Sequence, residues 1–414
     1  MKILLLPSYF TPEQFASSYL LENCNQAYAD EGFDMVVYAP MPCRGISDEV
    51  RNIYKGLSYE KSYNGKMVVH RFRLIKEGRN TYQRALRYII MCVKQVCLSL
   101  FSKDAKNCDL LFVSSTPPIQ GAMAALIKKI RKIPLVYNLQ DIFPDSMVST
   151  GMTQKGSLLW KLGRRIEDFT YRNSDKIIVI SNDFKKNIMA KGVPENKIEI
   201  IYNWVDEKAV VEIPRERNIL FDRYNLNRKD FYITYSGNIG HTQNLDMLID
   251  VAEILDKRYK DIKFVLIGEG AYKKSLEEKV NTKNINNIIL LPFQPYEEIS
   301  HVFSLGDAGL VISKPGVGTN SVPSKTWSIM SASKPVLANF DENELKEIIE
   351  ANNCGIFTKA GDIDGFVTSI LTLYDNRDLS KRLGKNGRKF IISNLTKEIG
   401  TKKFVEVVKN LTIF

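Results

Sequence analysis

Residues 110–138, LLFVSSTPPIQGAMAALIKKIRKIPLVYN, contain one complete strand–helix–strand unit. The apolar runs at 110–113 and 135–138 are short and nearly continuous, as strands are when a parallel sheet buries both of their faces. Between these runs, apolar residues recur at helical spacing over 119–131. A strand, a crossover helix and a second strand in this order predict a parallel α/β sheet.

The same alternation extends over the whole chain and restarts once. In the first half we predict strands at 3–6, 35–38, 67–72 and 176–180, and helices at 14–31, 81–101, 158–173 and 182–191. After a strand at 198–202, the second half predicts strands at 232–236, 264–267, 288–291, 308–312 and 335–338, and helices at 244–259, 273–281, 299–305, 325–333, 342–352 and 363–374.

The pattern therefore predicts two doubly wound, Rossmann-like α/β domains, over residues 1–205 and 206–395. We expect a C-terminal helix within 396–414 to pack back on the first domain. Ligands of open α/β sheets bind at the carboxyl ends of the strands. We therefore expect a site in a cleft between two domains that face each other.

The composition is that of an ordinary globular protein. Of 414 residues, 44% are hydrophobic and 25% are charged, which excludes a disordered or collagen-like chain. The apolar run at 88–93 is far shorter than the roughly 20 residues of a spanning helix, and the start, MKILLLP, is too short for a secretory signal. Six scattered cysteines without a CxxC pair favour reduced thiols in the cytosol.

Positive charge is concentrated in one region. The net charge is +11, and residues 51–100 hold 11 Lys and Arg against two acids, which predicts an anionic partner. On a helical wheel over 82–101, Arg84, Arg87 and Lys94 share one stripe, and apolar side chains including Ile90 cover the opposite face. This pattern is typical of a helix at an anionic membrane surface. A helix packed on the sheet and a solvated basic face are the alternatives.

Two nucleotide-binding motifs are missing. The loop after the first strand, PSYFTPEQFA at 7–16, has no glycine, which excludes a GxGxxG dinucleotide site, and no Walker A sequence occurs. One Asp-x-Asp, at 362–364, opens a predicted helix, and we expect it to cap that helix. The sequence therefore predicts neither a metal ion nor a resident cofactor.

One loop of the second half, YSGNIGHTQN at 235–244, joins a strand to a helix. Gly237 and Gly240 permit tight turns there, and the helix N-terminus behind them can bind an anion. A simple turn in which Asn244 caps the helix is the alternative.

A second loop, SKPGVGTNSVPSKT at 313–326, is more informative. It combines Gly316 and Gly318 with three hydroxyl residues and Lys325 at a helix start. Backbone N–H groups, hydroxyls and a lysine together make a phosphate cradle. A loop in which Ser324 only caps the helix is the alternative.

Seven stretches, kept in order over nearly the whole chain, resemble the GT-B-fold glycosyltransferases of family 4, a retaining group that includes capsule and O-antigen enzymes. They are NLQDIFP at 138–144, KIIVISN at 176–182, IYNWVD at 201–206, YSGNIGHTQN at 235–244, FVLIGEG at 264–270, VPSKTWSIM at 322–330 and KPV at 334–336. Within the family, the chain looks similar to N-acetyl-L-fucosamine transferases.

The resemblance assigns donor-binding positions to the second domain. They are Gly237, Asn238, His241, Gln243, Glu269, Gly270, Phe293, Gln294, Gly316, Gly318, Asn320, Ser324 and Ser328. The family has two Glu where this chain has Asn320 and Ser328, and often Arg and Lys where it has Asn238 and Gln243. Asn and Ser bind hydroxyl groups more weakly than a carboxylate does. Lys325 is then the main cation at the diphosphate, with His241 as a helper. For Phe293, which matches the nucleotide-base position, core packing is the alternative.

The first domain matches the acceptor side of the family. Asp141 matches a position near the acceptor-activating residue of related enzymes, where many have a His-Asp pair, and Gln140 replaces the His. A carboxylate at the end of a buried strand can take a proton from an acceptor hydroxyl; capping of the following turn is the alternative. In the first loop, Phe10, Glu13 and Gln14 match acceptor-side positions.

The resemblance implies transfer of a sugar, with retention, from a nucleotide sugar (UDP-linked by expectation) to a polyprenyl-diphosphate-linked glycan at the inner face of the cell membrane. Helix-terminal N–H groups and Lys325 would stabilise the leaving diphosphate without a metal. Three alternatives stay open: a non-catalytic sugar-nucleotide binder, motivated by the missing Glu pair; a sugar-nucleotide epimerase; and a nucleic-acid binder, which the absence of a binding motif disfavours.

Overall fold

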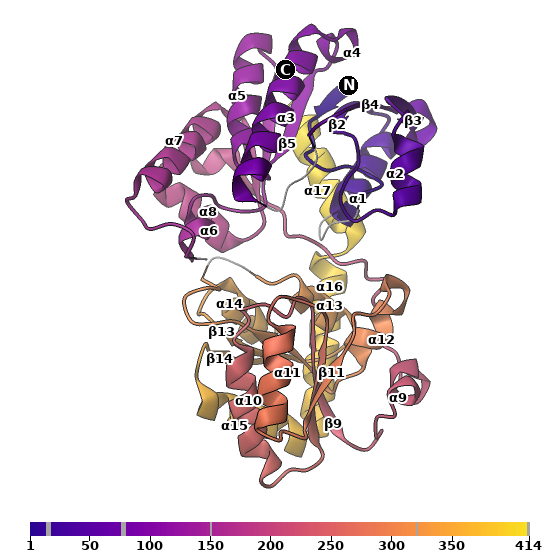
Figure 1. Cartoon of the computed structure of the whole chain (residues 1–414), viewed down its shortest axis with the longest axis vertical. Helices are drawn as coiled ribbons and strands as arrows, with labels where there is room; N and C mark the ends of the chain where they lie inside the picture. The colour runs from indigo at the N-terminus through magenta and orange to yellow at the C-terminus, as the bar shows by residue number, and fades with distance from the viewer. Residues whose placement is uncertain (14–17, 76–79, 150, 320–321, 412–414) are drawn as a thin grey trace. The chain divides into compact units, whose positions relative to one another are not determined.

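The computed structural model describes residues 1–13, 18–75, 80–149, 151–319 and 322–411. The chain divides into two compact units: unit 1 is Met1–Tyr202 with the chain from Gly400 onward, and unit 2 is Asn203–Ile399 (Figure 1). Unit 1 thus ends three residues before the predicted boundary of 205. Each unit is built around one sheet with helices on both faces, so the prediction of two Rossmann-like α/β domains is confirmed.

The sheet of unit 1 has eight strands in the order β3-β4-β2-β1-β5-β6-β7-β8. All neighbouring strands are parallel except the β3–β4 pair. The order reverses between β1 and β5. The strands are β1 (Lys2–Leu5), β2 (Asp34–Pro40), β3 (Tyr59–Ser62), β4 (Met67–Phe72), β5 (Leu110–Ser114), β6 (Leu135–Leu139), β7 (Lys176–Val179) and β8 (Ile198–Ile200).

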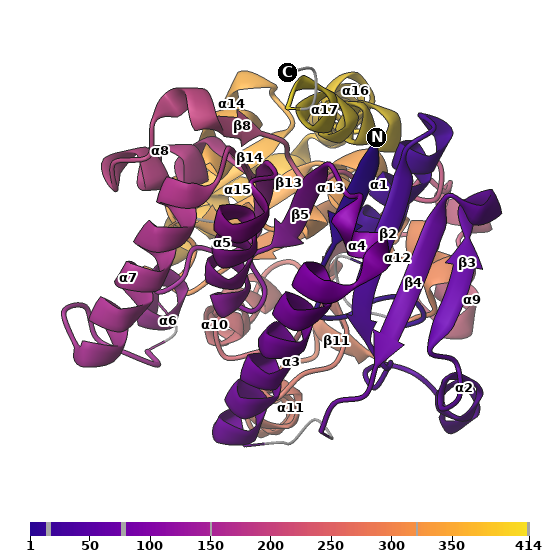
Figure 2. The ribbon, with the colours of Figure 1, turned by 90° about the horizontal axis from the view of Figure 1, so that it is seen from above.

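Helices cover both faces of this sheet. Figure 2 shows α3, α5 and α7 side by side along one face. Phe112 of β5 points to the other face, where its ring contacts Tyr28 of α1 and Phe404 of α17. The helices are α1 (Ser18–Asp30), α2 (Asp48–Tyr54), α3 (Thr81–Phe101), α4 (Lys103–Lys106), α5 (Ile119–Arg131), α6 (Asp145–Ser149), α7 (Leu158–Asn173), α8 (Asn182–Ala190) and α17 (Lys397–Asn410), with 3-10 turns at Tyr63–Gly65 and Glu195–Lys197.

Unit 2 has a six-stranded parallel sheet in the order β11-β10-β9-β12-β13-β14, which reverses between β9 and β12. The strands are β9 (Phe231–Ser236), β10 (Ile262–Ile267), β11 (Ile288–Leu291), β12 (Ala308–Ile312), β13 (Val336–Phe340) and β14 (Gly355–Lys359). The helices are α9 (Ile219–Arg223), α10 (Leu245–Asp256), α11 (Lys273–Thr282), α12 (Ile299–Ser304), α13 (Lys325–Ser331), α14 (Glu344–Ala351), α15 (Ile363–Asp375) and α16 (Arg377–Asn394), with 3-10 turns at Arg215–Arg217 and Tyr296–Glu298.

Most predicted elements are present, and the strands bury both faces as expected. Leu4 of β1, for example, is fully buried in the same layer as Val36 and Leu111, its partners on the two neighbouring strands. The sequence analysis missed the strands β3 and β14, the helices α2 and α16, and the short helices α4, α6 and α9. None of the helices within the described ranges is long and apolar enough to cross a membrane. All six cysteines are free thiols.

Candidate functional site

Two glycine-containing loops come together at the carboxyl ends of β9 and β10 in unit 2. Gly237 follows β9, and Gly268 and Gly270 follow β10; all three have positive φ, which glycine adopts without a steric penalty. Hydrogen bonds from Gly237 N to Ile267 O (3.0 Å) and from Ile239 N to Glu269 O (2.8 Å) tie the loops together. A Cβ atom on Gly268 or Gly270 would overlap the backbone of the β9 loop. Of the predicted donor residues, Gly237, Glu269 and Gly270 are therefore neighbours.

Lys325 joins this group from the first position of α13. Its Nζ lies 3.6 Å from the centre of the Tyr235 ring, and a Cβ atom on Gly237 would come within 3.1 Å of it. Among the residues that the structure describes, no carboxylate lies within ion-pair distance of Lys325. Burial of the amine lowers its pKa to about 7. An unpaired cation under a glycine loop is a site at which an anion would be stabilised.

The rest of the β9 loop is ordered by its own contacts. Gln243 Oε1 accepts from Gly240 N (3.1 Å), and the His241 ring lies 5.0 Å from that of Tyr272. The backbone carbonyl of Asn238 accepts from Tyr235 Oη (2.7 Å). The alternative that Asn244 caps α10 is wrong, because its φ is 50° and its side chain makes no capping hydrogen bond.

The loop after β12 differs from the predicted phosphate cradle. The N–H groups of Gly316 and Gly318 both donate to the carboxylate of Asp341, at 2.9 and 2.7 Å. Both N–H groups are therefore occupied by Asp341, and their role as donors to a phosphate stays a prediction. Ser324 makes no capping hydrogen bond, so the alternative that it only caps α13 is wrong too. Ser328 is half-buried within α13; Asn320 lies outside the described residues.

The two residues predicted at the nucleotide base have different environments. Phe293 is 70% exposed, so the core-packing alternative is wrong and its ring is free to stack. Gln294 is buried, and its amide contacts Arg223 (3.0 Å), Tyr224 (2.8 Å) and the Pro292 carbonyl (2.6 Å). Gln294 therefore fixes the segment on which Phe293 sits.

On the acceptor side of unit 1, Glu13 holds two loops together. Its carboxylate is 2% exposed and accepts from the N–H groups of Phe10 (3.1 Å), Cys43 (2.8 Å) and Arg44 (2.9 Å). The loops after β1 and β2 are thereby joined, and Glu13 is a structural anchor whose oxygens are already occupied. Phe10 is buried. Gln14 lies outside the described residues.

Asp141 follows β6 on the surface of unit 1. The N–H groups of Gln140 and Asp141 donate to Ser115 Oγ at 3.0 and 3.2 Å, and Ser146 Oγ of α6 donates to the Asp141 carboxylate at 3.0 Å. The surrounding protein displaces water from this carboxyl group and so raises its pKa, and the charge of Asp145 raises it further. A raised pKa suits a group that takes up a proton near neutral pH. The contact with α6 also fits the turn-capping alternative.

The predicted membrane residues of α3 need one correction. Arg87 is 4% exposed and points inward, where it donates to Ile75 O and contacts Cys43 Sγ (3.1 Å). It therefore cannot contact a membrane surface. Arg84 is exposed, Ile90 is half-buried, and Lys94 is exposed with its Nζ on Arg73 O (2.8 Å).

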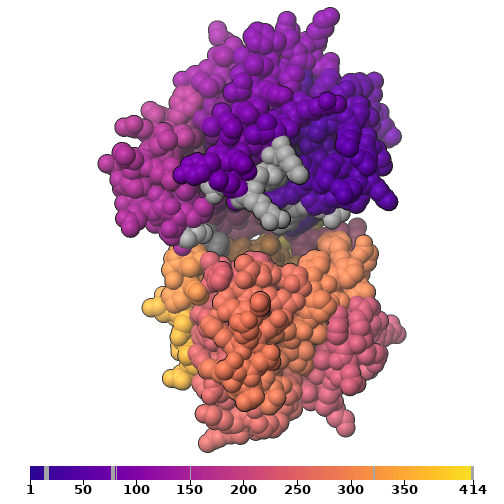
Figure 3. Space-filling model, viewed as in Figure 1, coloured from indigo at the N-terminus to yellow at the C-terminus, as the bar shows by residue number. Residues whose placement is uncertain are grey.

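Beside Arg84 and Lys94, α3 exposes several large apolar side chains to solvent. The exposed fractions are 83% for Tyr82, 52% for Leu86, 47% for Ile89, 57% for Val93 and 77% for Phe101. Figure 3 shows the purple segment that contains α3 at the surface of unit 1. The sequence analysis therefore found an amphipathic helix but assigned Arg87 to the wrong face.

No group of three His, Cys, Asp or Glu side chains suited to a metal ion occurs within the described ranges. The prediction for the Asp-x-Asp is confirmed, since Asp362 caps α15 by accepting from Gly365 N at 2.9 Å.

Comparisons with known proteins agree with this architecture. Residues 18–209 match the family described as Glycosyltransferase Family 4, and residues 216–390 match Glycosyl transferases group 1. The chain is 25% identical over 308 residues to a probable glycosyltransferase, WbjE of Pseudomonas aeruginosa, covering 74% of this chain and 76% of that one. It is 27% identical over 209 residues to WcaI of Escherichia coli, a putative colanic acid biosynthesis glycosyl transferase, covering 50% and 51% of the two chains.

Among solved structures, the crystal structure of Anabaena Alr3699/HepE in complex with UDP is similar, with a TM-score of 0.74 at 16% identity, over 99% of this chain and 100% of that one. At this identity the likeness concerns the fold. With the two family matches on consecutive halves, the chain belongs to the glycosyltransferases that join a family 4 domain to a group 1 domain in the GT-B fold.

Proposed function

We propose that this glycosyltransferase moves a sugar, with retention, from a UDP-sugar to a polyprenyl-diphosphate-linked glycan during synthesis of a surface polysaccharide. The observation that carries the proposal is the unpaired Lys325 amine beneath Gly237, beside the loop that follows β10. The name of the relative WcaI, a putative colanic acid biosynthesis enzyme, supports a polysaccharide product, and the UDP bound to HepE supports a UDP-linked donor.

In this proposal, unit 2 holds the donor. Lys325 neutralises the diphosphate, whose negative charge grows as the bond between the sugar carbon and the phosphate oxygen breaks. The exposed Phe293 ring stacks on the uracil base. Because Lys325 supplies the positive charge, we propose that the reaction needs no metal ion.

The acceptor hydroxyl is activated by Asp141 of unit 1. Its carboxylate takes the hydroxyl proton while the acceptor oxygen bonds to the sugar carbon and UDP departs. Retention requires that the acceptor approach from the face that the UDP leaves. We expect Asp141→Asn to lose transfer while keeping UDP affinity, because Asp141 belongs to unit 1 and Lys325, the proposed diphosphate cation, belongs to unit 2.

The test of this function is a transfer assay with EDTA present, in which labelled UDP-sugars are incubated with polyprenyl-diphosphate-linked glycans. The anomeric configuration of the product is read by NMR. We expect a lipid-linked product with the donor's configuration. UDP binding without any product would instead support the non-catalytic binder, and conversion of free UDP-sugar without acceptor would support the epimerase.

We also propose that unit 1 docks on the inner face of the cell membrane through α3. The exposed apolar side chains of Tyr82, Leu86, Ile89 and Val93 would enter the acyl boundary, and Arg84 with Lys94 would contact anionic headgroups. Each cation near such a surface is worth about 1 kcal/mol.

Charge reversal tests the docking surface. Arg84→Glu with Lys94→Glu should abolish co-sedimentation with anionic liposomes, because two attractions become repulsions. The matched control, Lys381→Glu with Lys385→Glu, changes the same charge on exposed positions of α16 and should sediment like the parent. Equal sedimentation of both variants would contradict docking through α3.

A further inference from the structure

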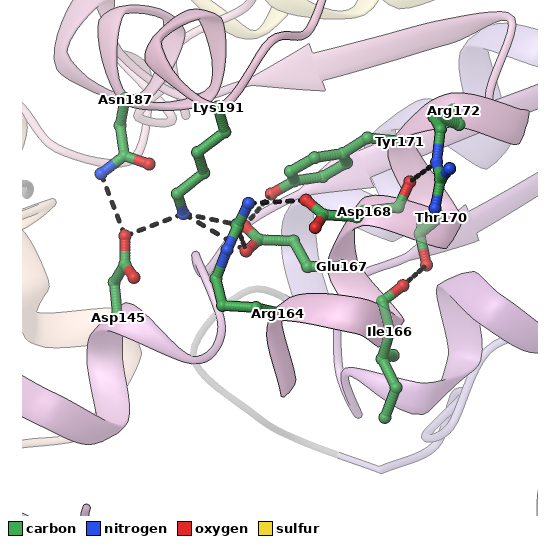
Figure 4. A network of polar contacts seen from close by, with 10 residues as sticks. All are labelled: Asp145, Arg164, Ile166, Glu167, Asp168, Thr170, Tyr171, Arg172, Asn187 and Lys191. Carbon is green, nitrogen blue, oxygen red and sulfur yellow. Dashed lines mark hydrogen bonds and ion pairs between the residues drawn. The ribbon is translucent and has the colours of Figure 1, made fainter. Parts of the chain in front are cut away.

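A partly buried ionic network joins α6, α7 and the end of α8 (Figure 4). Two of its residues, Glu167 and Tyr171, line the same pocket as Asp141. At its centre, Lys191 Nζ bridges two carboxylates, with Asp145 Oδ2 at 2.8 Å and Glu167 Oε1 at 3.0 Å. Asn187 Nδ2 also donates to Asp145 (3.1 Å). Lys191, which follows α8, thus connects Asp145, the first residue of α6, to Glu167 of α7.

The α7 side of the network is rigid. Glu167 is 6% exposed and accepts from Lys191, from Arg164 and from Tyr171 Oη (2.5 Å). Arg164 also pairs with Asp168 at 2.6 Å. Two cations and one hydroxyl hold this buried carboxylate in place, because removing Lys191 or Arg164 would leave its charge less compensated in a low-dielectric site.

On the α6 side, the network is connected to Asp141 through Ser146, the residue that follows Asp145. Ser146, which follows Asp145, donates its hydroxyl to Asp141 at 3.0 Å and its N–H to Ile142 O at 2.9 Å. Displacement of Asp145 would therefore move Ser146, one of the hydrogen-bond donors of the Asp141 carboxylate. The groups that face Asp141 are Ser146 and Asp145 on the α6 side, Tyr137 on β6, and Glu167 and Tyr171 on α7.

The charges of this site pair Lys191 with Asp145 and Glu167. Four acids (Asp141, Asp145, Glu167 and Asp168) surround two cations, Arg164 and Lys191. Arg164 contacts only Glu167 and Asp168 of these acids. Lys191 is therefore the cation that compensates Asp145, the acid whose charge acts on Asp141.

We propose that Lys191 is a positioning residue for Asp141: by holding Asp145 against Glu167, it fixes the turn that carries Ser146 and neutralises the acid beside the proposed base. The inference rests on the proposed function, because it assigns Lys191 a role through the residue that would accept the proton. Lys191, at the end of α8, lies outside the sequence motifs that indicated the site.

The first test reads Asp141 itself rather than turnover. In full-length protein labelled with carboxyl-13C aspartate, the Asp141 signal is assigned by its loss in Asp141→Asn and titrated against pH. In Lys191→Met the midpoint should rise by about one pH unit, since Asp145 is then uncompensated. In Asp145→Asn, which removes that charge instead, the midpoint should fall. An unchanged midpoint in both variants would overturn the proposal.

The second test follows the reaction. Lys191→Met should lower kcat about tenfold or more while the KM for the donor stays constant, and it should move the acid limb of the kcat profile to higher pH. Lys191→Arg should restore both, because guanidinium can bridge the same carboxylates. The matched control is Lys185→Met on the same helix, whose partner is the exposed Glu195 (2.6 Å); it should leave kcat and the acid limb unchanged.

The two tests separate this inference from the proposed function. If Asp141→Asn retains full transfer, Asp141 is not the base, yet the NMR midpoints still decide whether Lys191 controls its charge. If Lys191→Met loses activity with an unmoved acid limb and an unmoved midpoint, the effect is general destabilisation and the positioning role is contradicted.

Discussion

At the scale of single residues, the proposed donor site depends on the Lys325 amine, which is shielded from water and, among the described residues, has no carboxylate partner. Lys325 lies against the Tyr235 ring and under Gly237, and its pKa falls to about 7. The sequence alone indicated Lys325 as the phosphate cation because it starts a helix after a glycine-containing loop. It could not show that Asp341 takes up the N–H groups of Gly316 and Gly318, because that contact joins segments on two different strands.

The titration of Lys325 predicts how UDP affinity depends on pH. The free amine loses its proton as pH rises through about 7, whereas bound diphosphate favours the charged form. Affinity should therefore fall between pH 7 and 9, a range in which the phosphate is already ionised. Lys325→Arg stays protonated throughout and should give a flat profile. Calorimetric titrations of UDP at several pH values measure this dependence. A UDP affinity of the parent protein that stays constant between pH 7 and 9 would contradict the prediction.

At the scale of elements, periodicity predicted where most helices lie but not what each face contacts. The wheel over α3 placed Arg87 with Arg84 and Lys94, yet Arg87 points inward to the loops after β2 and β4. Those loops lie outside α3 in the sequence, and a helical wheel shows only the residues of the helix itself, so it could not predict these contacts. The missed α16 has many charges and two buried glycines; Gly384 packs against the backbone of Ser333, a contact that helix propensity does not reveal.

The inward position of Arg87 predicts a stability effect. Arg87→Met should destabilise unit 1 by about 1–3 kcal/mol, because the buried guanidinium loses its partly buried hydrogen bond to the Ile75 carbonyl and its contact with Cys43 Sγ. Arg84→Met, one turn earlier on the exposed face, should change stability by no more than about 0.5 kcal/mol. Urea unfolding followed by tryptophan fluorescence compares the two. A similar effect of both variants would contradict the inward assignment.

At the scale of the whole molecule, the chain leaves unit 1, builds unit 2 and returns. The restart of the strand–helix pattern near residue 198 made the two units predictable from sequence, and the sequence analysis also expected the C-terminal helix to return to the first domain. The exact boundary and the individual contacts of α17 required the structure. Phe404 of α17 packs against Phe112 (ring centroids 6.1 Å apart), and Lys409 pairs with Glu31 at 2.5 Å.

This return predicts that a C-terminal substitution weakens the N-terminal sheet. Phe404→Ala should destabilise unit 1 by about 3–5 kcal/mol, the usual cost of a large cavity. In hydrogen–deuterium exchange, protection should fall in β1 and β5 and stay constant in β9 and β10. The matched control is Phe366→Ala, a buried ring of unit 2, which should show the opposite distribution. Loss of protection in unit 2 upon Phe404→Ala would contradict the division into units.

The most direct measurement for the whole account is the affinity of UDP for the parent protein and for Lys325→Met, by calorimetry with EDTA present. Uridine, which lacks the diphosphate, is the control ligand. If Lys325 is the diphosphate cation, the variant should bind UDP about tenfold or more weakly, the typical loss for a hydrogen bond to a charged group, while uridine binds both proteins alike. Equal UDP affinity for the two proteins would contradict a donor site built around Lys325.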